Sequence, residues 1–294
     1  MSIARHGDVE IYYQSIGHET DPTLILINGL GSQCINFDLE FCQRFVERGL
    51  RVVRFDNRDV GLSSAFNRYR PDVFGTISAL GEGREPIVPY RLADMAGDTL
   101  AVLDALGVER AHVSGWSLGG MIAQQLAIDH PERLWSFASV MATTGDPDVG
   151  QPSPEALAIV LGPSEIDRKS IIAKRQELER IIGSPVYFDP QRVAEETGAA
   201  YDRNFNLAGA ARQLSAILAS GSRSARLAGV HVPALVVHGD ADRFIDVSGG
   251  VRTAQCVPGA RLEIIEGMGH DLSPHFWDRL VALIADHADA ARAL

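Results

Sequence analysis

Cysteine is scarce in this sequence, and its spacing excludes two classes of small structural site. The 294 residues contain three cysteines, Cys34, Cys42 and Cys256. Their odd number, their wide separation and the lack of a C-x-x-C pair argue against a disulfide framework and against a zinc site. We therefore expect buried or isolated thiols, and no bound metal.

Positively charged residues are also few relative to negatively charged ones. Lys and Arg together number 27 against 38 Asp and Glu, which gives a formal net charge of -11. No block of Lys and Arg offsets this excess, so the surface should repel phosphate backbones and acidic head groups. Nucleic acid is therefore not an expected partner.

Long apolar runs are missing as well. No segment approaches the roughly 18 to 20 apolar residues that a membrane span needs, and residues 1–8 lack the apolar stretch of a signal peptide. Hydrophobic residues nevertheless make up 46% of the chain and charged residues 22%, proportions typical of globular proteins. We expect a cytoplasmic protein that has no membrane span and buries a sizeable core.

Short apolar runs rich in β-branched residues recur along the chain and predict strands. They cover residues 9–13, 24–27, 52–55, 111–114, 137–140, 234–237 and 262–265. Amphipathic helix patterns lie between them, among them 36–48, which we expect to begin at Asn36, and 90–106. Because parallel neighbours need long crossovers and bury both sheet faces, the fold class should be α/β, with a mostly parallel central sheet and helices on both faces.

The alternation of strands and helices fails in one long region. Between about residues 143 and 229 no convincing strand is found and the pattern is helical, for example over 164–182. The predicted organisation is thus a core of residues 1–142 and 230–294 with a helical insertion at 143–229. We expect apolar residues of the insertion to contribute to a substrate pocket or to pack on the core: Leu161, Ile181, Tyr187, Phe188 and Leu218.

A G-x-S-x-G motif carries the chemistry. Gly115-Trp116-Ser117-Leu118-Gly119 follows a strand pattern and precedes a helix pattern, as in a nucleophile elbow. In so sharp a turn, side chains two positions before and two positions after the serine would collide with neighbouring backbone, so glycine is expected at both places. Ser117 is therefore the predicted nucleophile. Because a serine stands at this position, the reaction of dehalogenases and epoxide hydrolases, which use an aspartate nucleophile, is not expected.

A serine nucleophile needs a base, and the base needs an acid. His270, in Gly267-Met268-Gly269-His270, is the histidine that follows the last strand, where the Ser…Asp…His chain order places the base. Asp242 lies just beyond the preceding strand and is the predicted acid. Asp240 is expected to be a turn former, and Asp146 is a further alternative for the acid. His238, on a strand pattern, is expected to be structural.

Two backbone N–H groups are expected to form an oxyanion hole. Leu118 follows the nucleophile at a helix N-terminus, where free N–H groups and the helix dipole favour negative charge. Leu30 lies in the Gly-rich turn of residues 27–32, whose glycines permit a tight bend. An ordinary Gly-rich turn is the alternative interpretation of that segment.

The runs at residues 55–64 and 115–120 resemble the α/β-hydrolase superfamily and, within it, the aclacinomycin methylesterase group and related actinobacterial esterases and lipases. The resemblance implies a helical cap between the sixth and seventh core strands, which matches 143–229. It also implies the triad Ser117, Asp242 and His270, with Leu30 and Leu118 as oxyanion donors. One departure is Asn28-Gly29, where many superfamily members have His-Gly, so the anchoring of this loop is left open.

The predicted function is hydrolysis of carboxylic esters through an acyl-enzyme. No metal or organic cofactor is required, the expected partner is a small-molecule ester, and the oligomeric state is open. A lactonase or a cofactor-free perhydrolase with the same triad is the alternative among enzymes, and a small-molecule receptor on the same scaffold is the alternative outside them.

Overall fold

An eight-stranded, mostly parallel sheet forms the centre of the molecule in the computed structural model, which describes residues 2–163 and 166–292. The strand order is β1-β2-β4-β3-β5-β6-β7-β8. β1 and β2 join antiparallel to the edge at β4, and every neighbouring pair from β4 to β8 is parallel. The strands are β1 (Ser2–His6), β2 (Val9–Ile16), β3 (Thr23–Ile27), β4 (Arg51–Phe55), β5 (Ala111–Trp116), β6 (Leu134–Val140), β7 (Ala234–Gly239) and β8 (Arg261–Ile265).

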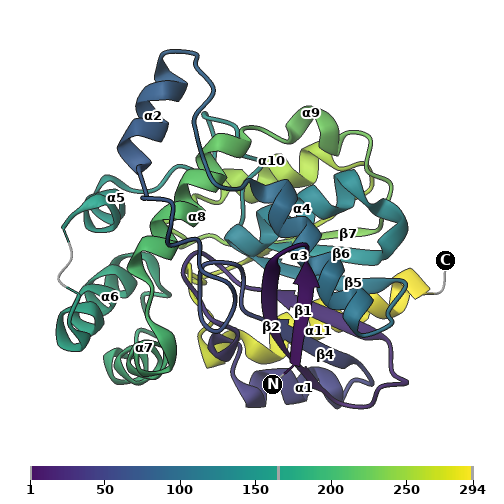
Figure 1. Ribbon diagram of the computed structural model, residues 1–294. Coiled ribbons are helices and arrows are strands. Elements are labelled where there is room, and N and C mark those ends of the chain that lie inside the picture. Colours follow the sequence, from purple (N-terminus) through teal and green to yellow (C-terminus); the bar gives the residue numbers. More distant parts are fainter. Residues whose placement is uncertain (1, 164–165, 293–294) are drawn as a thin grey trace.

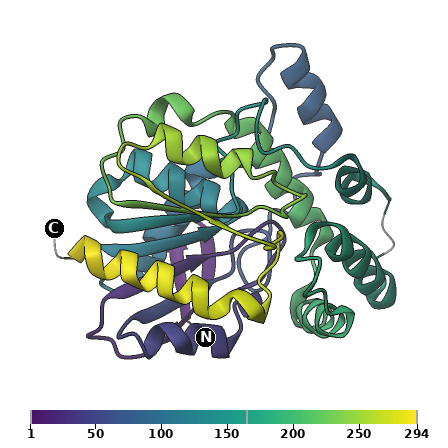
Figure 2. The same ribbon diagram turned by 180° about the vertical axis from the view of Figure 1, so that it is seen from behind.

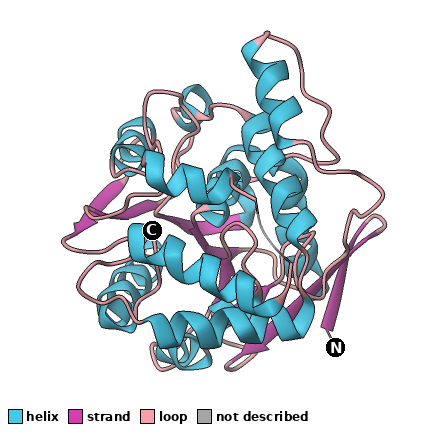
Figure 3. Ribbon diagram, turned by 90° about the vertical axis from the view of Figure 1, so that its left-hand side faces the viewer, coloured by secondary structure: helices cyan, strands magenta, loops and turns pink. Residues whose placement is uncertain are grey.

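Helices cover both faces of this sheet, as Figure 3 shows. Buried residues of α3, α4 and α10 pack on one face, and those of α1 and α11 pack on the other. Figure 2 shows α11 running along the second face. The helices of these two layers are α1 (Leu39–Val46), α3 (Leu92–Ala105), α4 (Leu118–Asp129), α10 (Ser248–Cys256) and α11 (Trp277–Arg292), with short 3-10 turns at Cys34–Asn36, Pro131–Arg133 and Pro274–Phe276. The predicted α/β fold class is confirmed.

A group of helices follows β6 and precedes β7. They are α5 (Pro154–Leu161), α6 (Arg168–Ile182), α7 (Pro190–Asn204), α8 (Leu207–Ser220) and α9 (Ser224–Leu227). In Figure 1, α5, α6 and α7 stand to one side of the sheet, and α8 runs between them and the core. Buried Arg223 ties the two ends of this segment together, because its backbone N–H donates to Thr144 O (2.9 Å) and its guanidinium to Thr143 O (2.8 Å).

Several element boundaries differ from the predictions. β1 was not predicted, and α2 (Val73–Gly81) also lies outside the predicted helices; it projects from the body and packs against α8 (Figure 1). The helix expected to begin at Asn36 starts at Leu39, because the Asp38 carboxylate accepts from Glu40 N and caps it there. Part of the predicted helix 164–182 falls at residues 164 and 165, outside the described residues, and α6 begins at Arg168.

Among the described residues, no helix has both the length and the apolar character needed to cross a membrane.

Candidate active site

Ser117 occupies the sharp turn between β5 and α4. Its backbone is in an uncommon conformation, with φ 56° and ψ -117°, and its N–H donates to Val140 O (2.9 Å). The neighbouring glycines are required by space: a Cβ on Gly115 would lie 2.0 Å from the carbonyl oxygen of Gly119, and one on Gly119 would lie 2.0 Å from that of Ile27. The turn thus presses the start of α4 against the end of β3 and presents the Ser117 hydroxyl at the carboxyl edge of the sheet.

The three side chains predicted as a triad form one hydrogen-bonded chain. His270 Nε2 lies 2.9 Å from Ser117 Oγ, and His270 Nδ1 lies 2.7 Å from Asp242 Oδ2. All three residues are at most 9% exposed. Because an ionised carboxylate only accepts, Nδ1 must carry the proton, which leaves Nε2 of the neutral imidazole free to accept the Ser117 proton.

Asp242 is held as an anion by its surroundings. Its Oδ1 accepts the backbone N–H groups of Phe244 (2.8 Å) and Ile245 (2.9 Å). Burial by itself raises the pKa of this carboxyl, but the charge of His270 and hydrogen bonds from His238 and His270 outweigh it and hold the pKa below its usual range. Asp242 therefore stays ionised while it orients His270.

The other two candidate acids lie elsewhere. Asp240 is exposed, and its Oδ1 accepts the Gly267 N–H (2.7 Å), which closes the turn before His270. Asp146 accepts from Arg252 Nη1 (2.8 Å) and from serine hydroxyls of the segment that returns to β7. Neither carboxylate contacts His270, so the structure brings only Asp242 to the histidine.

His238 has a closer relation to this site than the sequence indicated. It is fully buried, its Nε2 lies 2.8 Å from Ile245 O, and the same nitrogen lies 3.3 Å from Asp242 Oδ2. It therefore supports the segment that carries Asp242. The spacing of four residues between His238 and Asp242 was the one available signal, and a strand pattern does not reveal that a turn folds the two side chains together.

The loop that bears His270 is held by the segment after α6. His270 N–H donates to Ile182 O (2.7 Å), and Gly269 N–H donates to Ser184 Oγ (2.9 Å). Ser184 Oγ donates in turn to Asp271 Oδ1 (2.6 Å). The inserted helices are thus bonded directly to the histidine loop, a contact between residues about 85 positions apart that no local pattern predicts.

Leu30 and Leu118, the predicted oxyanion donors, both lie in backbone segments next to Ser117. Leu118 is the first residue of α4, where N–H groups lack intrahelical partners. Leu30 lies in the turn after β3, next to Gly29, where an added Cβ would lie 3.3 Å from Ser117 Cβ. The turn after β3 and the start of α4 therefore both lie against the serine.

A cavity of about 480 Å³ opens onto Ser117 and His270. Residues 28–30 and Leu272 line it from the core, and residues of α6 and α7 line it from the other side. Tyr187 and Phe188, two of the five apolar residues named from the sequence, line the cavity; Leu161, Ile181 and Leu218 do not. A second cavity of about 180 Å³ adjoins it beneath α6, α7 and α8, since the two have Leu30, Arg175 and Glu179 among their common lining residues.

The common wall of the two cavities carries an ion pair between a buried carboxylate and an exposed guanidinium. Glu179 is 6% exposed and pairs with Arg175. Burial raises the pKa of the Glu179 carboxyl, and Arg175 opposes this shift. Glu179 and Arg175 therefore offer charged contacts to a substrate group where the two cavities meet. Among the described residues, no group of three or more His, Cys, Asp or Glu side chains is arranged to hold a metal ion.

Comparison with known proteins places this geometry in a family. A model of the alpha/beta hydrolase fold matches residues 22–274, so the chain belongs to the α/β-hydrolase family. It is 31% identical to a rhodomycin D methylesterase of Streptomyces peucetius, with 97% of each chain covered. It is 26% identical to a putative carbamate hydrolase of Variovorax paradoxus, with 88% of this chain and 89% of that protein covered.

Solved structures agree on the fold. An enol-lactonase from Burkholderia xenovorans superposes with a TM-score of 0.75 at 23% identity, over 98% of this chain and all of that one. A meta-cleavage product hydrolase superposes with a TM-score of 0.77 at 19% identity, over 98% of each chain. The predicted resemblance to the methylesterase group is confirmed by the sequence relatives.

Proposed function

We propose that this protein is a serine hydrolase that cleaves carboxylic esters through an acyl-enzyme. The observation that carries the proposal is the chain of hydrogen bonds from Asp242 through His270 to Ser117 beside a cavity of about 480 Å³. This arrangement supplies a nucleophile, a base and an acid in the order that ester hydrolysis needs.

Each step has an assigned group. His270 Nε2 takes the proton of Ser117 Oγ, and the oxygen attacks the ester carbonyl carbon. The N–H groups of Leu30 and Leu118 bind the oxyanion that forms. His270 then gives its proton to the departing alcohol, which leaves an ester between Ser117 and the acyl group. Water, deprotonated by His270, attacks that ester, and the acid is released with Ser117 restored.

The proposed substrate is a methyl ester, or another ester of a small alcohol, with a bulky acyl part. Two observations support this: the relative that is 31% identical over nearly the whole chain is named as a methylesterase, and the cavity is within the range that holds drug-sized ligands. The inserted segment 143–229 acts in this proposal as a cap that selects the substrate, and cytoplasmic location stays a prediction.

A lactonase with the same triad is the second candidate. The observation that favours it is the similarity of fold to an enol-lactonase. A panel of methyl esters, aryl esters and lactones, assayed at one pH, separates the two functions through the ratios of kcat/KM.

The decisive test of the proposal is Ser117→Ala. The variant should fold as the wild type does and lose ester hydrolysis, by up to about a millionfold in turnover. A phosphonate that labels active serines should add to Ser117 in the wild type and to no other residue, as read by mass spectrometry. Retained turnover in the variant, or an adduct on a different side chain, would contradict the assignment.

A further inference from the structure

One buried glutamine of α8 contacts the turn that carries Leu30. Gln213 is fully buried, and its Oε1 accepts the Gly31 N–H at 2.9 Å. Its Nε2 donates to the backbone oxygen of Arg58 at 2.8 Å. Both polar ends of the side chain are therefore used, and because one partner is a donor and the other an acceptor, the amide has a single orientation.

The geometry of the turn makes this contact important for Leu30. Ser32 N–H donates to Gly29 O (3.2 Å), which closes a four-residue turn with Leu30 and Gly31 at its centre. Gly31 has φ +69°, which glycine adopts without strain. Because the peptide unit is planar, holding the Gly31 N–H also holds the plane that joins Leu30 to Gly31, and with it the direction of the Leu30 backbone.

The remaining bonds of this turn act at its ends. Asn28 Nδ2 donates to Gln33 O (2.9 Å), and Asn57 Nδ2 donates to Asn28 O (3.1 Å). Asn28 thus takes part in anchoring the loop in which many superfamily members carry His-Gly. Among the described residues, the side chain that forms a hydrogen bond with the centre of the turn is that of Gln213.

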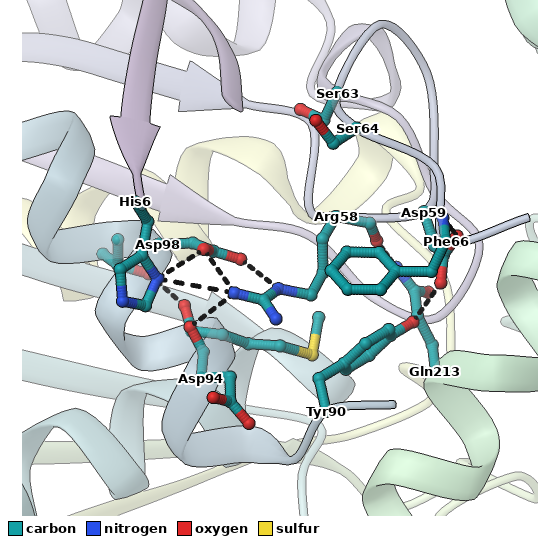
Figure 4. Close-up of polar contacts among 12 residues, drawn as sticks. His6, Arg58, Asp59, Ser63, Ser64, Phe66, Tyr90, Asp94, Asp98 and Gln213 are labelled. Carbon is teal, nitrogen blue, oxygen red and sulfur yellow. Dashed lines mark hydrogen bonds and ion pairs between the residues drawn. The ribbon is translucent and has the colours of Figure 1, made fainter. Parts of the chain in front are cut away.

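Gln213 itself is held firmly between two charged pairs. Its neighbour Arg212 donates to both oxygens of Asp59, at 2.7 and 2.8 Å, and all four side-chain atoms involved are buried. Arg58, whose backbone oxygen accepts from Gln213, donates twice to Asp98 at 2.6 Å. Figure 4 shows Gln213 beside Asp59 and Arg58, at the point where α8 meets the loop after β4.

We infer that Gln213 is a positioning residue that directs the Leu30 N–H toward the oxyanion. This inference rests on the proposed function and extends it, because it gives the inserted segment a part in stabilising the transition state as well as in substrate choice. An oxyanion hole whose donors are held in place before the reaction stabilises the transition state much more than the bound substrate. Loss of the Gln213 contact should therefore lower kcat and leave KM nearly unchanged.

The experiment uses Gln213→Met, which keeps the length of the side chain and removes both hydrogen bonds. With p-nitrophenyl acetate we expect kcat to fall about 10- to 100-fold while KM stays within about twofold. The affinity for phenylboronic acid, which forms a tetrahedral adduct on an active serine, should fall as well, because the adduct places an oxygen in the hole. Gln213→Ala is measured in parallel, in case the Met variant does not fold.

Two controls make the result decisive. Ser215→Ala alters another buried side chain of α8, whose hydroxyl has no hydrogen-bond partner in the described part of the chain, and should leave kcat and boronate affinity unchanged. If Ser117→Ala is inactive but a folded Gln213 variant keeps the wild-type kcat, the inference about Gln213 is wrong and the proposed function stands. The same holds if the Gln213 variants change only KM or thermal stability. An active Ser117→Ala variant overturns the proposed function instead.

Discussion

Two aspartates that stand two positions apart in the sequence occupy different environments. Asp242 is 5% exposed and bonded to His270, whereas Asp240 is exposed and accepts the backbone N–H of Gly267, in the turn before His270. The carboxylate of Asp242 sets the imidazole tautomer, and that of Asp240 stabilises the loop. The two residues are thus a natural matched pair for substitution.

Asp242→Asn should lower turnover about ten-thousandfold, because an amide can present its N–H to His270 and so favour the wrong tautomer. Asp240→Asn should keep turnover within about threefold and cost roughly 0.5 to 1.5 kcal/mol of unfolding free energy. Steady-state kinetics and urea unfolding of both variants check this. An inactive Asp240→Asn enzyme beside an active Asp242→Asn enzyme would reverse the assignment of the acid.

At the scale of elements, the edge strand β1 is joined to α3 through His6. His6 Nδ1 lies 2.9 Å from Asp98 Oδ1 (Figure 4). Gly97 leaves the space for the imidazole ring, since a Cβ there would lie 2.4 Å from His6 Cε1. The hydrogen bond to Asp98 raises the pKa of His6, and burial partly opposes it. β1 is five residues long and lies at the sheet edge, and these tertiary contacts help to hold it.

This contact predicts a pH-dependent term in stability. Because the pKa of His6 is raised above its unfolded value of 6.5, the stabilisation is fully present below that pH and is lost as the pH rises through the folded-state pKa. His6→Gln should therefore lower Tm at pH 5.5, where His6 is charged, and lower it less at pH 9, where His6 is neutral. The expected change at pH 5.5 is only about 1 to 2 °C, because the side chain is partly exposed and its charge is screened by solvent. Calorimetry at both pH values tests it, with His18→Gln as the control on an exposed histidine. A Tm difference independent of pH would show that the ion pair is not the cause.

At the scale of the molecule, the proposed substrate space lies between the central sheet and the helices that connect β6 to β7. The larger cavity lies between residues 28–30 of the core and α6 and α7, and the smaller one extends it toward α8. Two ion pairs connect these helices to the loop after β4: the buried pair of Arg212 with Asp59, and the pair of half-buried Arg203 with Asp56 (2.8 Å). α7 and α8 are thus tied to the loop after β4, which fits the proposed role of these helices in selecting substrates.

Filling the smaller cavity should change selectivity rather than total activity. Thr197, on α7, lines it, so Thr197→Phe should lower kcat/KM for esters with long or multi-ring acyl groups about tenfold relative to acetate esters. Ala199→Phe places the same side chain on the exposed side of α7 and should leave the ratio unchanged. Specificity ratios over a series of acyl lengths decide the matter; a uniform loss for all substrates would mean that the smaller cavity holds no part of them.

Much of the fold and the central residues of the site are predictable from local patterns. The strand-turn-helix pattern with glycines around Ser117 is recognisable within one short segment, although Gly119 is also required by the carbonyl of Ile27 on β3. The spacing of apolar residues indicates which face of a single element is buried. Element ends were less predictable: the helix expected from Asn36 begins at Leu39, since several residues there compete as caps. β1 and α2 were missed because each buries few residues, Ala4 in β1 and Thr76 and Ala79 in α2.

The sequence by itself determined the α/β class, the nucleophile elbow at Ser117 and the chain order that points to Asp242 and His270, because each of these depends on residues near one another in the chain. Only the tertiary structure decided that His238 lies against Asp242, that Ser184 holds the histidine loop and that Gln213 holds the Leu30 turn. The last two contacts join residues 85 and 182 positions apart. Their partners are chosen by how helices pack on the sheet, which depends on the shape of the whole core and leaves no spacing in the sequence to be recognised.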